Sequence, residues 1–115
     1  MIYGENHNTE RKSMIHVIAV VTAKPGMRDT ILTHFRANVP AVKAEEGCIE
    51  YGATVDADPA LPIQTKYGSD TFVVVEKWSS LETLKAHGAA PHMAAYAAKT
   101  REHIASRTIH IMQPA

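Results

Sequence analysis

The apolar residues of this chain change their spacing several times, and the order of those changes restricts the fold more than any other feature. Residues 14–21 (MIHVIAVV) form a short run rich in β-branched side chains, which indicates a buried strand. The sequence Lys24-Pro25-Gly26 ends this strand, because proline cannot donate to a sheet and glycine tolerates a turn. In residues 27–45 the apolar side chains recur every three or four positions instead, which predicts an amphipathic helix.

Pro40 lies inside that helical pattern. Proline removes one helical hydrogen bond and its ring crowds the preceding turn, so we expect a kink or a break near Val39. Gly47 follows shortly after the last turn, which is where glycine commonly ends a helix. A second strand is therefore expected to begin at Cys48.

Two strands are expected on either side of a long loop. Residues 48–55 alternate as a strand does, and residues 71–78 (TFVVVEKW) are the most apolar strand candidate of the chain. Residues 56–70 between them contain two prolines and a glycine, with no helical pattern. Two strands joined in this way favour an antiparallel hairpin.

The last third of the chain predicts two helices and a fourth strand. Ser79 is a candidate N-cap, and Glu82, three residues later, completes a capping box. Pro91 suits the first turn of a second helix, which is expected to extend over residues 92–106. Residues 107–113 then alternate polar and apolar side chains, which indicates a strand.

The resulting order, β-α-β-β-α-α-β, is the ferredoxin-like βαββαβ plan, an α+β fold, with the second helix split in two. Residues 14–115 are enough for one domain with its own hydrophobic core. Residues 1–13 are polar and lack the apolar core of a signal peptide. We interpret them as a flexible N-terminal extension.

One face of such a sheet has no helices over it. Three strands are expected to place apolar side chains there, namely Val20 or Val21, Val73 or Val74, and Ile109 or Ile111. A monomer would expose this surface to water. We therefore expect a homodimer in which two sheets pack together.

Composition argues against several kinds of partner. The formal net charge is +0 and the pI is about 7.1, so nothing attracts the chain as a whole to nucleic acid or to an anionic membrane. No apolar run approaches the roughly 18 residues of a membrane-spanning helix. Cys48 is the only cysteine, which excludes an internal disulfide and fits a reducing compartment. We expect a cytoplasmic protein.

The end of the third strand carries two candidate site residues, Glu76 and Trp78. They share one face of the strand because side chains alternate. Trp78 has the ring to stack on a planar aromatic substrate, and Glu76 has the carboxylate to accept a proton or orient a partner. The alternative is that Trp78 packs in the core and Glu76 makes a cross-strand hydrogen bond.

Two histidines and two tyrosines are further candidates. His87 follows the apolar stripe of the short helix, where it could move a proton or simply cap the helix end. His92 lies in the first turn of the next helix, where an anionic oxygen could bind, or it is a surface residue. Tyr51 could offer a phenol to the same pocket, and Tyr67 could act as a lid residue. Structural packing is the alternative for both tyrosines.

The sequence contains no pattern that points to a metal or a cofactor. The seven histidines are spread along the chain, and His87 and His92 have no third ligand nearby to complete a zinc pattern. Nothing local activates Cys48 as a nucleophile. Phosphate-binding loops and nucleotide fingerprints are also missing. We therefore expect neither a metal nor a cofactor.

The short motifs, in their order and spacing, resemble the antibiotic biosynthesis monooxygenase family over residues 14–112. The matching segments are Lys24-Pro25-Gly26, Glu46-Gly47-Cys48 with Tyr51, Glu76-Lys77-Trp78, Leu84 with His87, and Pro91-His92-Met93. The resemblance implies a ferredoxin-like subunit that dimerises through its sheet into an α/β-barrel. It also implies a pocket between sheet and helices in each subunit.

The same resemblance implies a chemistry. Characterised relatives oxidise quinols or polyphenolic anthrones with O₂ and no cofactor, since the substrate supplies the electrons. The protein deprotonates the substrate and stabilises the anion, and Trp78, His87 and Tyr51 suit such a pocket. Relatives that degrade haem use an asparagine in the first strand, which residues 14–21 lack. Residues 56–70 form a longer loop than is usual in the family.

We therefore expect a cofactor-independent monooxygenase that acts on a small aromatic, quinol-like or phenolic substrate. In this reading His87 is the base, Trp78 binds the substrate ring, and Tyr51, Glu76, His92 and Tyr67 contribute to substrate binding. Two alternatives use the same pocket. One is a non-catalytic ligand-binding or stress-related dimer, and the other is a small-molecule isomerase in which His87 moves protons without oxygen.

Overall fold

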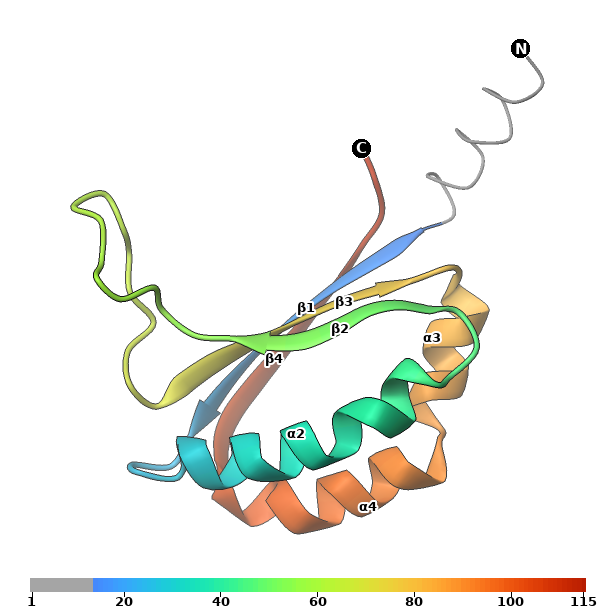
Figure 1. The fold of residues 1–115 in the computed structure, drawn as a ribbon, viewed down its shortest axis with the longest axis horizontal. Helices are drawn as coiled ribbons and strands as arrows, with labels where there is room; N and C mark the ends of the chain where they lie inside the picture. The colour runs from blue at the N-terminus through green and yellow to red at the C-terminus, as the bar shows by residue number, and fades with distance from the viewer. Residues whose placement is uncertain (1–13) are drawn as a thin grey trace.

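The computed structural model describes residues 14–115, which form a four-stranded antiparallel sheet with helices against one face (Figure 1). The strands are β1 (Ile15–Ala23), β2 (Cys48–Thr54), β3 (Thr71–Trp78) and β4 (Ile104–Met112). The helices are α2 (Arg28–Lys43), α3 (Leu81–Gly88) and α4 (Pro91–Thr100), and a 3₁₀ turn, η1 (Arg101–His103), leads into β4. The predicted α+β fold and its element order are confirmed, whereas the predicted extension over residues 1–13 lies outside the described residues.

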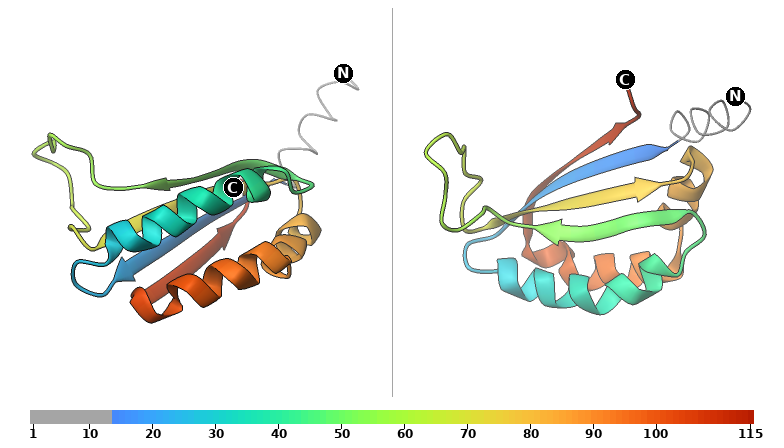
Figure 2. Two further views of the ribbon diagram at one scale, coloured as in Figure 1. Left: turned by 60° about the horizontal axis from the view of Figure 1, so that its bottom comes forward. Right: turned by 45° about the horizontal axis from the view of Figure 1, so that its top comes forward.

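The sheet order is β2-β3-β1-β4, so the first strand lies at the centre beside the third and fourth (Figure 2). Neighbouring strands are antiparallel throughout, and β2 and β3 form the predicted hairpin. α2 and α4 lie side by side beneath the sheet, with α3 at one end (Figure 2). Of the described helices, none combines the length and the apolar character that crossing a membrane requires.

The predicted helix break near Val39 and one predicted helix boundary are wrong. α2 continues through Pro40 to Lys43, because this proline lies in the last turns and only one backbone carbonyl of the preceding turn loses its helical partner. The kink that Pro40 also predicts near Val39 stays a prediction. The helix expected over residues 92–106 ends earlier. Ile104 already pairs with Ala23 of the central strand, so pairing with β1 takes these residues into β4.

The capping box of α3 lies one residue later than predicted. Ser80, and not Ser79, is the N-cap, and its hydroxyl accepts a hydrogen bond from the backbone N–H of Thr83 at 3.2 Å. Ser79 instead donates its backbone N–H to Gly47 at 2.9 Å, which holds it against the start of β2. Gly47 has φ +81°, and a Cβ there would lie 2.5 Å from Thr83 Cγ2. Glycine is thus needed for this close approach.

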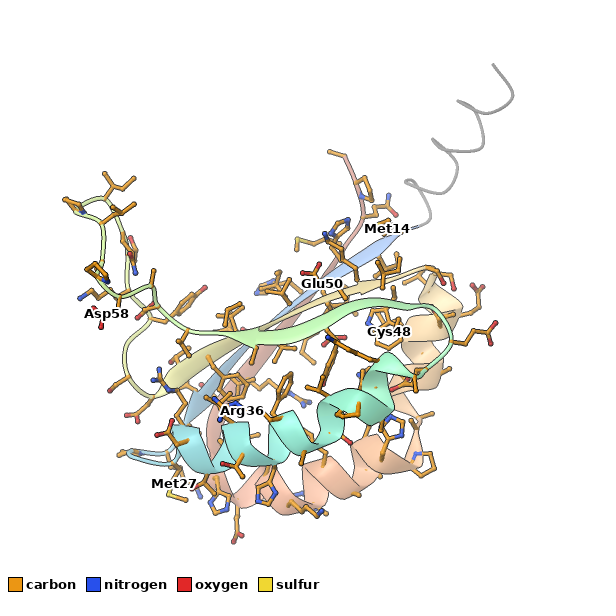
Figure 3. All side chains as sticks on the ribbon, in the orientation of Figure 1. Met14, Met27, Arg36, Cys48, Glu50 and Asp58 are labelled. Carbon is orange, nitrogen blue, oxygen red and sulfur yellow. The ribbon has the colours of Figure 1, made fainter. Side chains whose placement is uncertain are left out.

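Alternation in the strands separates a buried face from an open face. Along β1 every second residue is buried against the helices, and β3 follows the same alternation from Phe72 to Trp78. The apolar side chains of the open face are Ile18, Val20, Val73, Val75 and Met112. Figure 3 shows Glu50 on this face as well, pointing away from the helices. The face therefore carries an apolar centre with the Glu50–Lys77 ion pair (3.1 Å) on the β2 side.

The prediction that Ile109 or Ile111 belongs to the open face is wrong. Ile109 pairs with Ala19 and Ile111 pairs with Val17, both of which are buried on the helix side. Paired residues point to the same face of a sheet, so both isoleucines face the helix side. They remain 49% and 56% exposed there. The helices therefore leave the inner face of β4 partly uncovered.

The loop between β2 and β3 projects away from the sheet (Figures 1 and 3). At its base the Asp56 carboxylate accepts backbone hydrogen bonds from Tyr67 at 3.0 Å and Gly68 at 2.8 Å. These bonds hold the pKa of Asp56 below its ordinary value. Leu61 and Ile63 are exposed at its far end.

Candidate functional site

A cavity of about 800 Å³ lies between the sheet and the helices. This volume is within the range of small-molecule binding sites. Its walls are mainly apolar and include Val17, Val74 and Phe35 from the core and Met93 from α4. The partly uncovered inner face of β4 forms one side, where Ile109 and Ile111 line the opening. The cavity therefore suits a largely apolar or aromatic molecule.

Four acidic or imidazole side chains form a connected group at one end of this cavity. His87 Nδ1 lies 2.9 Å from Glu45 Oε2, and His87 Nε2 lies 4.0 Å from Glu76 Oε1. Trp78 Nε1 donates a hydrogen bond of 2.8 Å to the same Glu76 oxygen. His92 Nε2 approaches Glu45 Oε2 at 2.7 Å from the other side. Of the group, Glu76 and His87 line the cavity.

Local structure explains why these residues meet. Strand alternation puts Glu76 and Trp78 on the helix face of β3. Tyr51 of β2 is the cross-strand partner of Glu76. His87 occupies the last turn of α3, which packs at the end of that strand. Glu45 follows the end of α2 in the turn that leads into β2. Four separate segments of the chain thus converge on one end of the cavity.

The geometry sets the tautomer of His87. A carboxylate only accepts hydrogen bonds, so the 2.9 Å contact with Glu45 places a proton on Nδ1 of His87. A neutral imidazole then has its lone pair at Nε2, the nitrogen that faces Glu76. The 4.0 Å between that nitrogen and Glu76 Oε1 is too long for a direct hydrogen bond. His87 is therefore oriented as a proton acceptor beside a buried carboxyl group.

Burial changes the acidity of the groups around His87. Desolvation raises the pKa of Glu76, although the Trp78 hydrogen bond opposes this rise, as does the charge that His87 carries once it is protonated. Burial also raises the pKa of the Tyr51 phenol above its ordinary value, so this phenol stays protonated as a donor. The Tyr51 ring stacks on Phe35 with 5.1 Å between ring centroids and meets the His87 ring edge-on at 5.6 Å.

The predicted site residues separate into two groups. Glu76, His87 and Tyr51 line the cavity together. Trp78 is completely buried behind His87, with the two ring centroids 4.7 Å apart, so a ligand in the cavity meets His87 before it meets Trp78. The role of Trp78 here is to hold Glu76 and His87, and stacking on a substrate would require it to be uncovered.

His92 and Tyr67 lie outside the cavity lining. His92 contacts Glu45 with its imidazole and thus reaches the cavity through that carboxylate. Tyr67 is 60% exposed in the projecting loop. Sequence reasoning missed Glu45, because it stands among the charged residues of a helix end and no local pattern distinguishes it. Its partners lie 42 and 47 residues further along the chain.

The cavity end provides proton-transfer groups but no cluster of metal ligands. Within residues 14–115, no three side chains of His, Cys, Asp or Glu are grouped so that they could hold a metal ion. Cys48 lies next to the group, yet burial and the neighbouring Glu45 and Glu76 raise the pKa of its thiol. A thiol of raised pKa is a weaker nucleophile at neutral pH. The arrangement is best suited to removing a proton from a bound ligand.

Comparison with known proteins gives consistent results. Residues 14–99 match the family described as "Antibiotic biosynthesis monooxygenase". "Probable quinol monooxygenase YgiN" of Escherichia coli (strain K12) is 36% identical over 103 residues, which are 88% of this chain and 98% of that protein. The crystal structure of PA3566 from Pseudomonas aeruginosa has a TM-score of 0.75 at 22% identity and covers 91% of this chain and 97% of that one.

A second solved structure extends the fold comparison. A conserved protein from Methanosarcina mazei Go1 has a TM-score of 0.79 at 18% identity, and the match covers 94% of this chain and 99% of that one. At these identities the two structures establish the fold alone. The relative from Escherichia coli and the matching family description are what relate the chain to proteins with monooxygenase names.

Proposed function

This chain belongs to the antibiotic biosynthesis monooxygenase family, and from that membership we propose that it is a cofactor-independent monooxygenase of small quinol-like or phenolic compounds. The observation that carries the proposal is the placement of His87. Its Nε2 faces an apolar cavity beside Glu76, while Glu45 holds Nδ1 from behind. This is the arrangement of an oriented general base next to a substrate-sized space.

In the proposed reaction a substrate hydroxyl occupies the space between His87 and Glu76. His87 Nε2 takes the phenolic proton, and the Glu45 carboxylate stabilises the imidazolium that forms. The protonated Tyr51 phenol is the donor available to the new phenolate. Apolar walls exclude water from the anion, which increases its tendency to react with O₂.

The redox balance is closed by substrate and dioxygen. A ring carbon of the phenolate forms a bond to O₂, and the peroxide takes the proton back from His87 to give a hydroperoxide at a carbon that still carries hydrogen. The hydrogen on that carbon and the terminal OH of the hydroperoxide leave as water, which converts the carbon into a carbonyl. The substrate thereby gives four electrons to O₂. One oxygen atom enters the product and the other becomes water. A quinol is thereby converted into a hydroxyquinone, and the protein supplies only proton transfer and electrostatics.

Oxygen uptake tests the proposal directly. Purified protein is mixed with a panel of quinols and phenols in labelled dioxygen, and oxygen consumption and product mass are recorded. We expect uptake above the uncatalysed rate for at least one quinol, with one labelled oxygen atom in its product. A panel that binds without consuming oxygen would contradict the monooxygenase and favour the ligand-binding dimer. Proton exchange or rearrangement of a ligand without oxygen would favour the isomerase.

We also propose that the protein is a homodimer that buries the open sheet face. The apolar centre of that face supports this proposal, because a monomer would leave Ile18, Val20, Val73 and Val75 in contact with water. Light scattering should give about twice the 12.6 kDa of one chain. Val75→Asp should shift the protein to the monomer, and Ile63→Asp in the projecting loop should not. A monomeric parent protein would contradict the proposal.

A further inference from the structure

The second end of the cavity has a chemical character of its own. Arg107 of β4 and Arg101 of η1 both line the cavity. Tyr96 of α4 lines the cavity as well, and it lies near Arg107: burial raises the pKa of this phenol to about 12, although the Arg107 charge opposes the rise. Two guanidinium groups and a protonated phenol are therefore among the polar groups at this end.

Strand register gives the separation between the two ends. Glu76 pairs with Val17 of the central strand, and Arg107 pairs with Val21 of the same strand. These positions are four residues apart on β1, which corresponds to about 13 Å along a strand. Ala19 and Ile109 line the cavity between the two ends and are both apolar. A ligand that reaches both ends is thus a molecule with an aromatic or aliphatic middle.

The charges around the cavity are unbalanced. Lys85, Arg101 and Arg107 line it, and Glu76 is the one carboxylate among the lining residues. Within residues 14–115 neither arginine forms an ion pair with an acidic side chain, and both are solvent-exposed. Arginine presents a planar fork of donors that matches a carboxylate. The two arginines therefore have no acidic side chain among the described residues as a partner, and an anionic group of a ligand could pair with them.

We propose that the substrate carries an acidic group, a carboxylate or a group of similar charge, which Arg101 and Arg107 bind at the opposite end of the cavity from the hydroxyl held at His87 and Glu76. This rests on the proposed function for the position of the hydroxyl. The substrate class is thus a hydroxyaryl or quinol acid with a short chain between ring and anion. A neutral quinol of the same size would leave the two arginines solvated by water, without an anionic partner.

Calorimetric binding in the absence of turnover tests the acidic group. The probes are a naphthol with a butanoate chain on the opposite ring and the methyl ester of the same molecule. We expect the acid to bind roughly tenfold or more tightly than the ester, as charge-assisted hydrogen bonds would give. Arg107→Gln and Arg101→Gln should each remove most of this preference and leave ester binding unchanged. Arg36→Gln, an exposed arginine on α2 outside the cavity, is the matched control.

Equal binding of acid and ester would overturn the inference, as would a preference for the acid that survives both arginine substitutions. Added salt should weaken the binding of the acid and leave the binding of the ester unchanged. The test is independent of catalysis. If only neutral quinols cause oxygen uptake, the monooxygenase proposal stands and the acidic-substrate proposal is wrong. Arginine-dependent binding of the acid without any oxygen uptake would retain the acidic ligand and reject the monooxygenase.

Discussion

His87→Gln should lower the turnover number of substrate oxidation by about a hundredfold or more, the usual contribution of a general base. Glutamine is close to histidine in size and its amide can still donate to Glu45, but it cannot take up a proton. The apolar walls remain, so we expect KM to change much less than the turnover number. Initial rates of oxygen uptake over a range of substrate concentrations measure both quantities.

His34→Gln is the matched control, because this histidine is partly exposed on α2 and lies outside the cavity lining. Its rate should equal that of the parent protein. Glu45→Gln separates the positioning role from the proton transfer. The amide no longer fixes the proton on Nδ1 of His87, so the pH profile of the rate should change while the cavity stays intact. A His87→Gln variant with the parent rate would assign the base elsewhere, with Glu76 as the remaining candidate.

Trp78→Ala should destabilise the fold by about 3–5 kcal/mol, the range for truncating a large buried aromatic side chain. Trp78 has an exposed fraction of 0% and packs at the end of β3, so its removal leaves a cavity in the core. It also leaves buried Glu76 without its N–H donor. Urea unfolding followed by circular dichroism measures the change, because Trp78 is the only tryptophan for fluorescence.

Trp78→Phe distinguishes packing from hydrogen bonding. Phenylalanine keeps most of the ring and loses the donor to Glu76, so we expect a smaller loss of about 1–3 kcal/mol. Leu61→Ala, in the exposed loop, should be close to neutral. A loss below about 1 kcal/mol for Trp78→Ala would show that the indole does not support this end of the core, since even Ile→Val in a core costs that much.

His87 and Trp78, the residues of these two predictions, are neighbours with different roles in the proposed site. His87 lines the cavity, where the proposed reaction needs a base, whereas Trp78 lies behind it and donates a hydrogen bond to Glu76. Both residues were identifiable from the sequence as pocket candidates. Their division into a proposed base and a supporting residue was not, because it depends on a ring-to-ring distance of 4.7 Å and on which ring reaches the cavity.

Where the structure differs from expectation, the cause is pairing or packing between distant segments. Ile109 and Ile111 alternate with polar residues, but this alternation does not say which face of the sheet carries the isoleucines. Their pairing with Ala19 and Val17 places them on the helix side. Ser80 replaces Ser79 as the N-cap because Gly47 accepts the Ser79 backbone N–H.

The sequence by itself determined the element order and the α+β fold, because the spacing of apolar residues and the turn residues act over a few positions at a time. It also identified His87, Glu76 and Tyr51 as side chains near one strand end. Only the tertiary structure decided which charges meet. Glu45 contacts His87 across 42 residues of sequence, and the two arginines after α4 line the same cavity as Glu76. Such contacts depend on how helices pack on a sheet, which no local spacing encodes.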